Sequence, residues 1–87
     1  MGKYKVTFKK SVQKDFKSIP KSDVLKILAK IDSLVDNPRR VGAIKLSGSD
    51  LYRIRQGLYR IVYEIIDQEL KVLVIKVGSR SDIYKRT

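Results

Sequence analysis

The feature that most constrains the fold of this chain is a run of three β-rich segments in its C-terminal half. The segments cover residues 51–55, 58–66 and 70–77 and consist largely of β-branched, aromatic and other apolar residues. Short breaks, Gln56-Gly57 and Asp67-Gln68, separate them. Breaks of this length join antiparallel neighbours, because a parallel pair needs a crossover connection of about a dozen residues or more. The sequence therefore predicts a three-stranded antiparallel meander.

The N-terminal half adds one strand pattern and two helical patterns. Residues 3–8 alternate polar and apolar side chains, as a half-buried strand does. Apolar residues recur at helical spacing over residues 12–19, which end before Pro20, and again along one face of residues 21–35. Residues 39–50 contain two glycines and predict a loop.

These patterns fit one domain over residues 1–87. A chain of this length buries only about 60% of its unfolded surface, enough for one sheet packed on one layer of helices. We predict an α+β fold with an antiparallel sheet of about four strands, formed by the N-terminal strand and the C-terminal meander. Two N-terminal helices are expected to cover one face of this sheet.

The strand register predicts a cluster of arginines. If Gln56-Gly57 forms the turn, Arg53 faces Arg60 across the first hairpin. Side chains alternate between the two faces of a sheet, so Arg53, Arg55 and Arg60 project from the same face. The other face should be core, and it carries Tyr52, Ile54, Tyr59, Ile61, Tyr63 and Ile65.

The same register, continued through Asp67-Gln68, places Arg60 opposite Ile75 and brings Arg80 near the other arginines. Like charges facing each other across strands are destabilising, which favours an anion site at this cluster. Lys45 and Tyr84 are expected beside it, where Tyr84 could stack on a base. The alternatives are an ordinary solvated arginine row and a tyrosine that only packs.

The charge balance points to polyanions. Lys and Arg number 20 against 9 Asp and Glu, a formal net charge of +11. An excess this large favours RNA, DNA or the ribosome as a partner, although an acidic protein segment would serve equally well. A solvated basic surface is the alternative for the N-terminal lysines.

Two absences narrow the chemistry. Without Cys and His the chain has no thiolate nucleophile, no Ser-His-Asp triad and no His- or Cys-ligated metal, so we expect neither a metal nor a cofactor. The longest purely apolar run, Val72–Ile75, is far shorter than the ~20 residues that span a bilayer, and the polar start is unlike a signal peptide. We expect a cytoplasmic protein without membrane contact.

Four segments together resemble the RelE toxins of the RelE/ParE toxin–antitoxin superfamily: NPR, KLSG, LYRIRQGLYRIVYEI and VGSRSDIY. The resemblance spans essentially the whole chain. It implies an mRNA interferase that enters the ribosomal A site, cuts the codon there and is silenced by a partner antitoxin. Such an enzyme needs no His or metal, because RNA supplies the 2′-OH nucleophile and cations can stabilise the phosphorane.

The resemblance also implies individual roles. Arg53 and Arg55 match basic positions that contact the scissile region, and Arg60 matches a transition-state-stabilising arginine. Arg80 matches a basic position near the leaving group, and Tyr84 matches a tyrosine that stacks on or orients the substrate base. The expected products are a 2′,3′-cyclic or 3′-phosphate and a 5′-OH.

The chain departs from well-studied relatives at Arg53 and Arg55, where those proteins have lysines and one lysine has been proposed as general base. Arginine is a poor base because its pKa lies above about 12. Either Arg55 acts only through its charge, or Tyr84, Lys45 or a ribosomal group removes the proton.

Partners follow from the charge. Lysines of the first helical segment are expected to dock on ribosomal RNA phosphates: Lys9, Lys10, Lys14 and Lys17. The cognate antitoxin should be acidic and carry apolar anchors. The alternatives to an endoribonuclease acting on ribosome-bound mRNA are a ParE-like inhibitor of DNA gyrase and a non-catalytic RNA- or ribosome-binding module.

Overall fold

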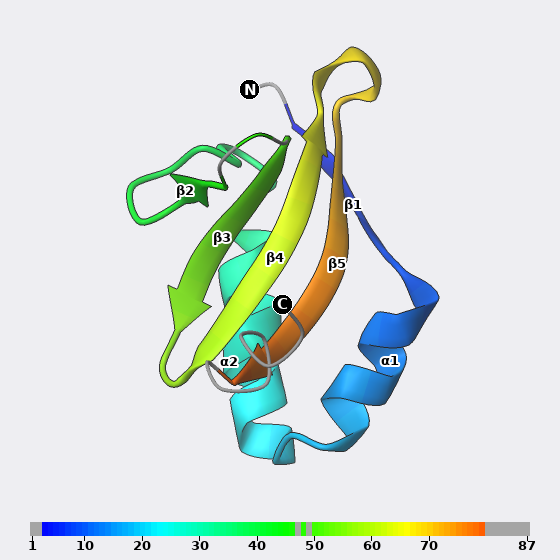
Figure 1. Cartoon of the computed structure of the whole chain (residues 1–87), viewed down its shortest axis with the longest axis vertical. Coiled ribbons are helices and arrows are strands. Elements are labelled where there is room, and N and C mark those ends of the chain that lie inside the picture. Colours follow the sequence, from blue (N-terminus) through cyan, green and yellow to red (C-terminus); the bar gives the residue numbers. More distant parts are fainter. Residues whose placement is uncertain (1–2, 47, 49, 80–87) are drawn as a thin grey trace.

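The computed structural model describes residues 3–46, 48 and 50–79, and in these residues two helices lie against a five-stranded sheet (Figure 1). The elements in chain order are β1 (Lys5–Phe8), α1 (Lys10–Lys17), α2 (Lys21–Asp32), β2 (Ile44–Lys45), β3 (Leu51–Gln56), β4 (Tyr59–Ile66), the 3₁₀ turn η1 (Asp67–Glu69) and β5 (Lys71–Ser79). The predicted α+β class is confirmed.

The sheet has the strand order β1-β5-β4-β3-β2. β3, β4 and β5 form the predicted antiparallel meander. β1 pairs with β5 in parallel, with Val6 opposite Val72, so the expectation of a wholly antiparallel sheet is wrong. The chain leaves β1 through both helices and reaches β5 last, and this long crossover permits a parallel neighbour. The expected loop over residues 39–50 contributes the short edge strand β2.

The helices cover one face and one edge of the sheet (Figure 1). α2 lies behind β3 and β4, and its buried side chains are Ile27 and Ile31. α1 lies beside β5, beyond the point where β1 ends. There the Asp15 carboxylate accepts a hydrogen bond of 3.1 Å from the backbone N–H of Val77. α1 thus provides a hydrogen-bond acceptor for an N–H group of β5 that no longer has β1 beside it.

The predicted core face is confirmed. Ile54, Ile61, Tyr63 and Ile65 are buried, and Tyr52 and Tyr59 pack against them as partly buried rings. The Tyr63 hydroxyl donates a 2.6 Å hydrogen bond to the carbonyl oxygen of Pro38, and burial raises the pKa of Tyr63 to about 12. Neither α1 nor α2 has the length and apolar content needed to cross a membrane.

The first hairpin turns one residue later than the sequence predicts. Gln56 pairs with Tyr59, so the turn is Gly57-Leu58, and Arg55 rather than Arg53 lies opposite Arg60. Gly57 has φ of +61°, the left-handed value that the first central residue of a type II′ turn requires. Glycine adopts this value without steric cost, which places it first in the turn. Both strands slip together, so every side chain keeps its predicted face.

The second hairpin contains an irregularity that the sequence reasoning missed. Val62 pairs with Lys76 but Tyr63 pairs with Val74, which leaves Ile75 as an extra residue in β5. Arg60 therefore lies opposite Gly78, and the prediction that it faces Ile75 is wrong. The bulge returns Val77 to the core, where it is 1% exposed, and turns Lys76 to the opposite face.

Candidate functional site

The sheet surface opposite the helices carries Arg53, Arg55 and Arg60, and we call it the arginine face. Arg55 and Arg60 occupy directly opposed positions on β3 and β4. Opposed residues in an antiparallel pair have Cβ atoms about 5 Å apart, and Arg53 lies two residues along β3 from Arg55. The alternation of side chains predicted this shared face, and the strand pairing brings the three arginines together.

The three arginines differ in burial. Arg55 is exposed, Arg53 is half-buried, and Arg60 is only 3% exposed. The Nε atom of Arg53 is buried and has no hydrogen-bond partner in the described part of the chain. A buried donor without an acceptor costs about 1–3 kcal/mol, and an anion that reached it would remove this penalty. The surface therefore differs from a fully solvated row of arginines.

A small pocket opens at the turn end of the arginine hairpin. Its volume is about 140 Å³, and it is lined by Arg55, Gly57, Leu58, Tyr59 and Arg60. This is several times the share of liquid volume that one water molecule occupies, about 30 Å³. Two guanidinium groups thus come from adjacent strands to one hollow, an arrangement suited to bidentate binding of phosphate oxygens.

Lys76 joins the arginine face through the bulge at Ile75. It lies opposite Val62, which in turn lies opposite Arg53. Its Nζ is 3.0 Å from Oδ1 of Asp15, and the two side chains are 30% and 12% exposed. A lysine within the apolar run of residues 70–77 is the one signal of the bulge, because an unbroken strand would bury it in the core.

Lys45 lies on the other face of the sheet. It pairs with Tyr52, and directly opposed residues share a face, so the prediction that it joins the arginines is wrong. Instead, Lys45 lines a separate hollow of about 360 Å³ with Arg39, Tyr52 and Asp67 among other residues. Ile44, 50% exposed, takes the position beside Arg53.

The hollow near Lys45 contains a fixed polar network at the end of the sheet away from the arginine hairpin. Arg39 donates to both Asp67 carboxylate oxygens, at 3.2 and 2.7 Å, and its Nε donates to the Tyr52 hydroxyl at 3.2 Å. The Tyr4 hydroxyl donates to Asp67 at 2.8 Å. The hydrogen bond from Arg39 lowers the pKa of Asp67, and the hydrogen bond to Asp67 raises the pKa of Tyr4. The sequence analysis did not single out these residues.

The predicted docking lysines are all exposed. Lys9 is the N-cap residue of α1, while Lys10, Lys14 and Lys17 follow at spacings of four and three residues. This spacing places the last three on one stripe of the helix. Two further predicted site residues, Arg80 and Tyr84, lie outside the residues that the structure describes. Within the described residues, no cluster of three or more Asp or Glu side chains could hold a metal.

The chain was compared with families, curated proteins and solved structures. Residues 6–84 match the family described as the ParE toxin of the type II toxin–antitoxin system parDE. The chain is 33% identical to the mRNA interferase toxin RelE of Escherichia coli K12 over 86 residues, which cover 93% of this chain and 90% of that protein. It is 30% identical to toxin RelG of Mycobacterium tuberculosis over 89 residues, covering 95% and 98% of the two chains.

The fold is also shared. The archaeal RelE–RelB complex from Pyrococcus horikoshii contains a chain that superposes with a TM-score of 0.80 at 32% identity, covering 90% of this chain and 96% of that one. The relatives are therefore matched over nearly their whole length.

Proposed function

This chain belongs to the RelE-type toxins of the RelE/ParE superfamily, and from that premise we propose that it is a ribosome-dependent, metal-independent mRNA endonuclease. In this proposal it binds in the ribosomal A site and cleaves the codon there by attack of the RNA 2′-OH on the adjacent phosphate. The result is inhibition of translation. The relative from Escherichia coli named as an mRNA interferase supports the endonuclease activity.

The observation that carries the proposal is the convergence of Arg55 and Arg60 on one hollow, with the unpartnered Nε of Arg53 beside it. Cleavage by the 2′-OH requires the nucleophile to be held in line with the phosphate and negative charge to be neutralised as the phosphorane forms. Guanidinium groups held by adjacent strands meet the second requirement without solvent reorganisation at the moment of reaction.

Roles are proposed as follows. Arg60, held nearly out of solvent, stabilises the charge of the phosphorane, and the exposed Arg55 and half-buried Arg53 bind the phosphates around the scissile bond. Arg80 and Tyr84 are proposed to act near the leaving group and on the substrate base. Lys45 is dropped as a candidate general base because it lies on the other face, which leaves Tyr84 or a ribosomal group.

We also propose the partners. The stripe Lys10, Lys14 and Lys17, together with Lys9, docks on ribosomal RNA, and an acidic antitoxin neutralises the toxin. The Pyrococcus horikoshii relative in complex with RelB supports a protein partner of this kind. Action on ribosomes places the protein in the cytoplasm.

The test is cleavage of mRNA on programmed ribosomes. The wild-type protein should cut in the A site and leave free mRNA nearly intact, and the upstream fragment should end in a 2′,3′-cyclic or 3′-phosphate. Arg60→Ala should reduce the rate by about 10²–10³-fold, the range for removing one transition-state charge stabiliser. Lys21→Ala on α2, an exposed lysine away from the arginine face, is the matched control. Equal rates for the Arg60→Ala and control variants would contradict the assigned site.

A second candidate is inhibition of DNA gyrase, which the match to the ParE family favours. The two functions separate in a pair of assays. Inhibition of gyrase supercoiling without ribosomal cleavage would select the second, and cleavage without gyrase inhibition would select the first. RNA binding with neither activity would indicate a non-catalytic module.

A further inference from the structure

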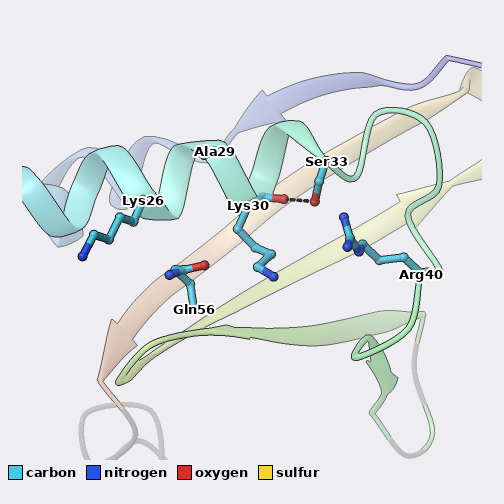
Figure 2. Close-up of a pocket in the computed structure, with 6 residues that line it drawn as sticks. All are labelled: Lys26, Ala29, Lys30, Ser33, Arg40 and Gln56. Atoms are coloured by element: carbon cyan, nitrogen blue, oxygen red, sulfur yellow. Dashed lines mark hydrogen bonds between the residues drawn. The ribbon is translucent and has the colours of Figure 1, made fainter.

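A basic groove lies between α2 and the turn end of β3, on the helix side of the sheet (Figure 2). It encloses about 310 Å³ and is lined by Lys26, Ala29, Lys30, Ser33, Arg40 and Gln56. Gln56 pairs with Tyr59 and so shares the core face, opposite the arginine face. The groove is therefore separate from the proposed RNA site.

The lining of this groove carries three cations and no carboxylate. Lys30 and Arg40 are half-buried, and Figure 2 shows both side chains extending into the space between the helix and β3. Within the described residues, none of Lys26, Lys30 and Arg40 forms an ion pair, whereas the neighbouring Arg39 is held by Asp67. The positive charge of the groove is thus not neutralised by a carboxylate from the described residues.

The spacing of the cations suits an extended acidic chain. Lys26 and Lys30 are four residues apart on α2, about 6 Å along the helix axis, and Arg40 follows beyond the C-terminal end of the helix. Alternate side chains of an extended polypeptide lie about 6.6 Å apart on one side. Carboxylates at alternate positions would therefore meet successive cations.

The open edge of β3 favours a polypeptide over RNA. The backbone N–H of Leu46 donates to the carbonyl of Leu51, so the backbone groups of Leu51, Arg53 and Arg55 point toward the β2 side. In the described residues β2 pairs with β3 only as far as Arg53, which leaves the edge at Arg55 open beside Gln56 and the groove. An added strand can both donate to and accept from such an edge, whereas phosphates only accept.

We propose that this groove is a docking site for an extended acidic segment of the partner antitoxin. The proposal rests on the proposed function for the identity of the partner, but not for the binding chemistry. Carboxylates contact Lys26, Lys30 and Arg40, and the segment lies along the free edge of β3. Because the groove and the arginine face lie on opposite sides of the sheet, occupation of one does not require the other to be vacant.

The experiment uses ¹⁵N-labelled full-length protein titrated with a poly-L-glutamate of about 20 residues, and separately with a uridine oligonucleotide of about ten residues. Poly-L-glutamate should shift the amide resonances of Lys26, Lys30, Arg40 and Gln56 with saturation. Shifts confined to the arginine face would overturn the proposal. Displacement of the poly-L-glutamate from the groove by the oligonucleotide would also overturn it, in favour of a second RNA site.

Charge reversal provides the quantitative arm. The double variant Lys26→Glu/Lys30→Glu should weaken poly-L-glutamate binding by at least about tenfold, equivalent to about 1.4 kcal/mol, whereas Lys21→Glu on the same helix should weaken it by about twofold. Circular dichroism checks folding, and Arg40→Ala replaces the double variant if that protein is unfolded. An equal loss in the groove and control variants would refute a defined site. Cleavage on programmed ribosomes, measured in parallel, shows whether the proposed function fails independently.

Discussion

Replacing Arg55 by threonine should make the fold more stable and the protein less active. Arg55 is exposed and lies directly opposite Arg60, so the two positive charges face each other across the ladder. Like charges at opposed positions destabilise a sheet, and cross-strand pairs are worth about 0.2–1 kcal/mol. Threonine keeps a β-branched side chain in the strand, so strand propensity is retained while the repulsion is removed.

The magnitude follows from these positions. A gain of about 0.5 kcal/mol corresponds to a rise in Tm of about 2–4 °C for a domain of this size. At about 1 M salt the Debye length falls to about 3 Å, so the gain should largely disappear. Cleavage on programmed ribosomes should fall by about 10²-fold, as expected when a charge near the developing phosphorane is removed.

Calorimetry at low and high salt measures the first effect, and the ribosomal cleavage assay measures the second. Lys45→Thr is the matched control: an exposed strand lysine on the opposite face, for which we expect no gain in Tm and unchanged cleavage. A lower Tm for Arg55→Thr, or a gain that persists at high salt, would refute the argument from charge repulsion. Unchanged cleavage would remove Arg55 from the site.

Three further predictions concern the scaffold. Tyr63→Phe removes the hydrogen bond to Pro38 and should lower the unfolding free energy by about 1–3 kcal/mol, measured by urea denaturation; an unchanged midpoint would contradict this. Because Arg39 lowers the folded-state pKa of Asp67, its contribution to stability is present above the ordinary value of 3.8 and is lost as the pH falls through the folded pKa. Melting curves from pH 6 to pH 2 should therefore show a smaller acid loss for Asp67→Asn than for wild type, and parallel curves would disprove the linkage. Gly57→Ala forces an alanine to a φ of +61° and should cost about 1–2 kcal/mol, with a lower Tm as the readout and no change as the contrary result.

The prediction of the fold succeeded where local patterns are strong. The apolar spacing of α2 and the short breaks around β4 depend on neighbouring residues, so they are visible in the sequence. The direction of β1 was not, because its partner β5 lies more than sixty residues away and nothing local specifies it. Lys76 was missed for a related reason: only a bulge in β5 turns it out of the core.

The residue order alone was sufficient to assign Arg53, Arg55 and Arg60 to one face and the tyrosines and isoleucines to the other. A period of two survives a shift of the whole hairpin, so that assignment held although the turn moved by one residue. Three-dimensional packing was needed to set Arg55 against Arg60, to expel Lys76 from the core, to put Lys45 on the opposite side and to bury Arg60. Those outcomes depend on which distant strands meet and how closely they pack, which short-range alternation does not encode.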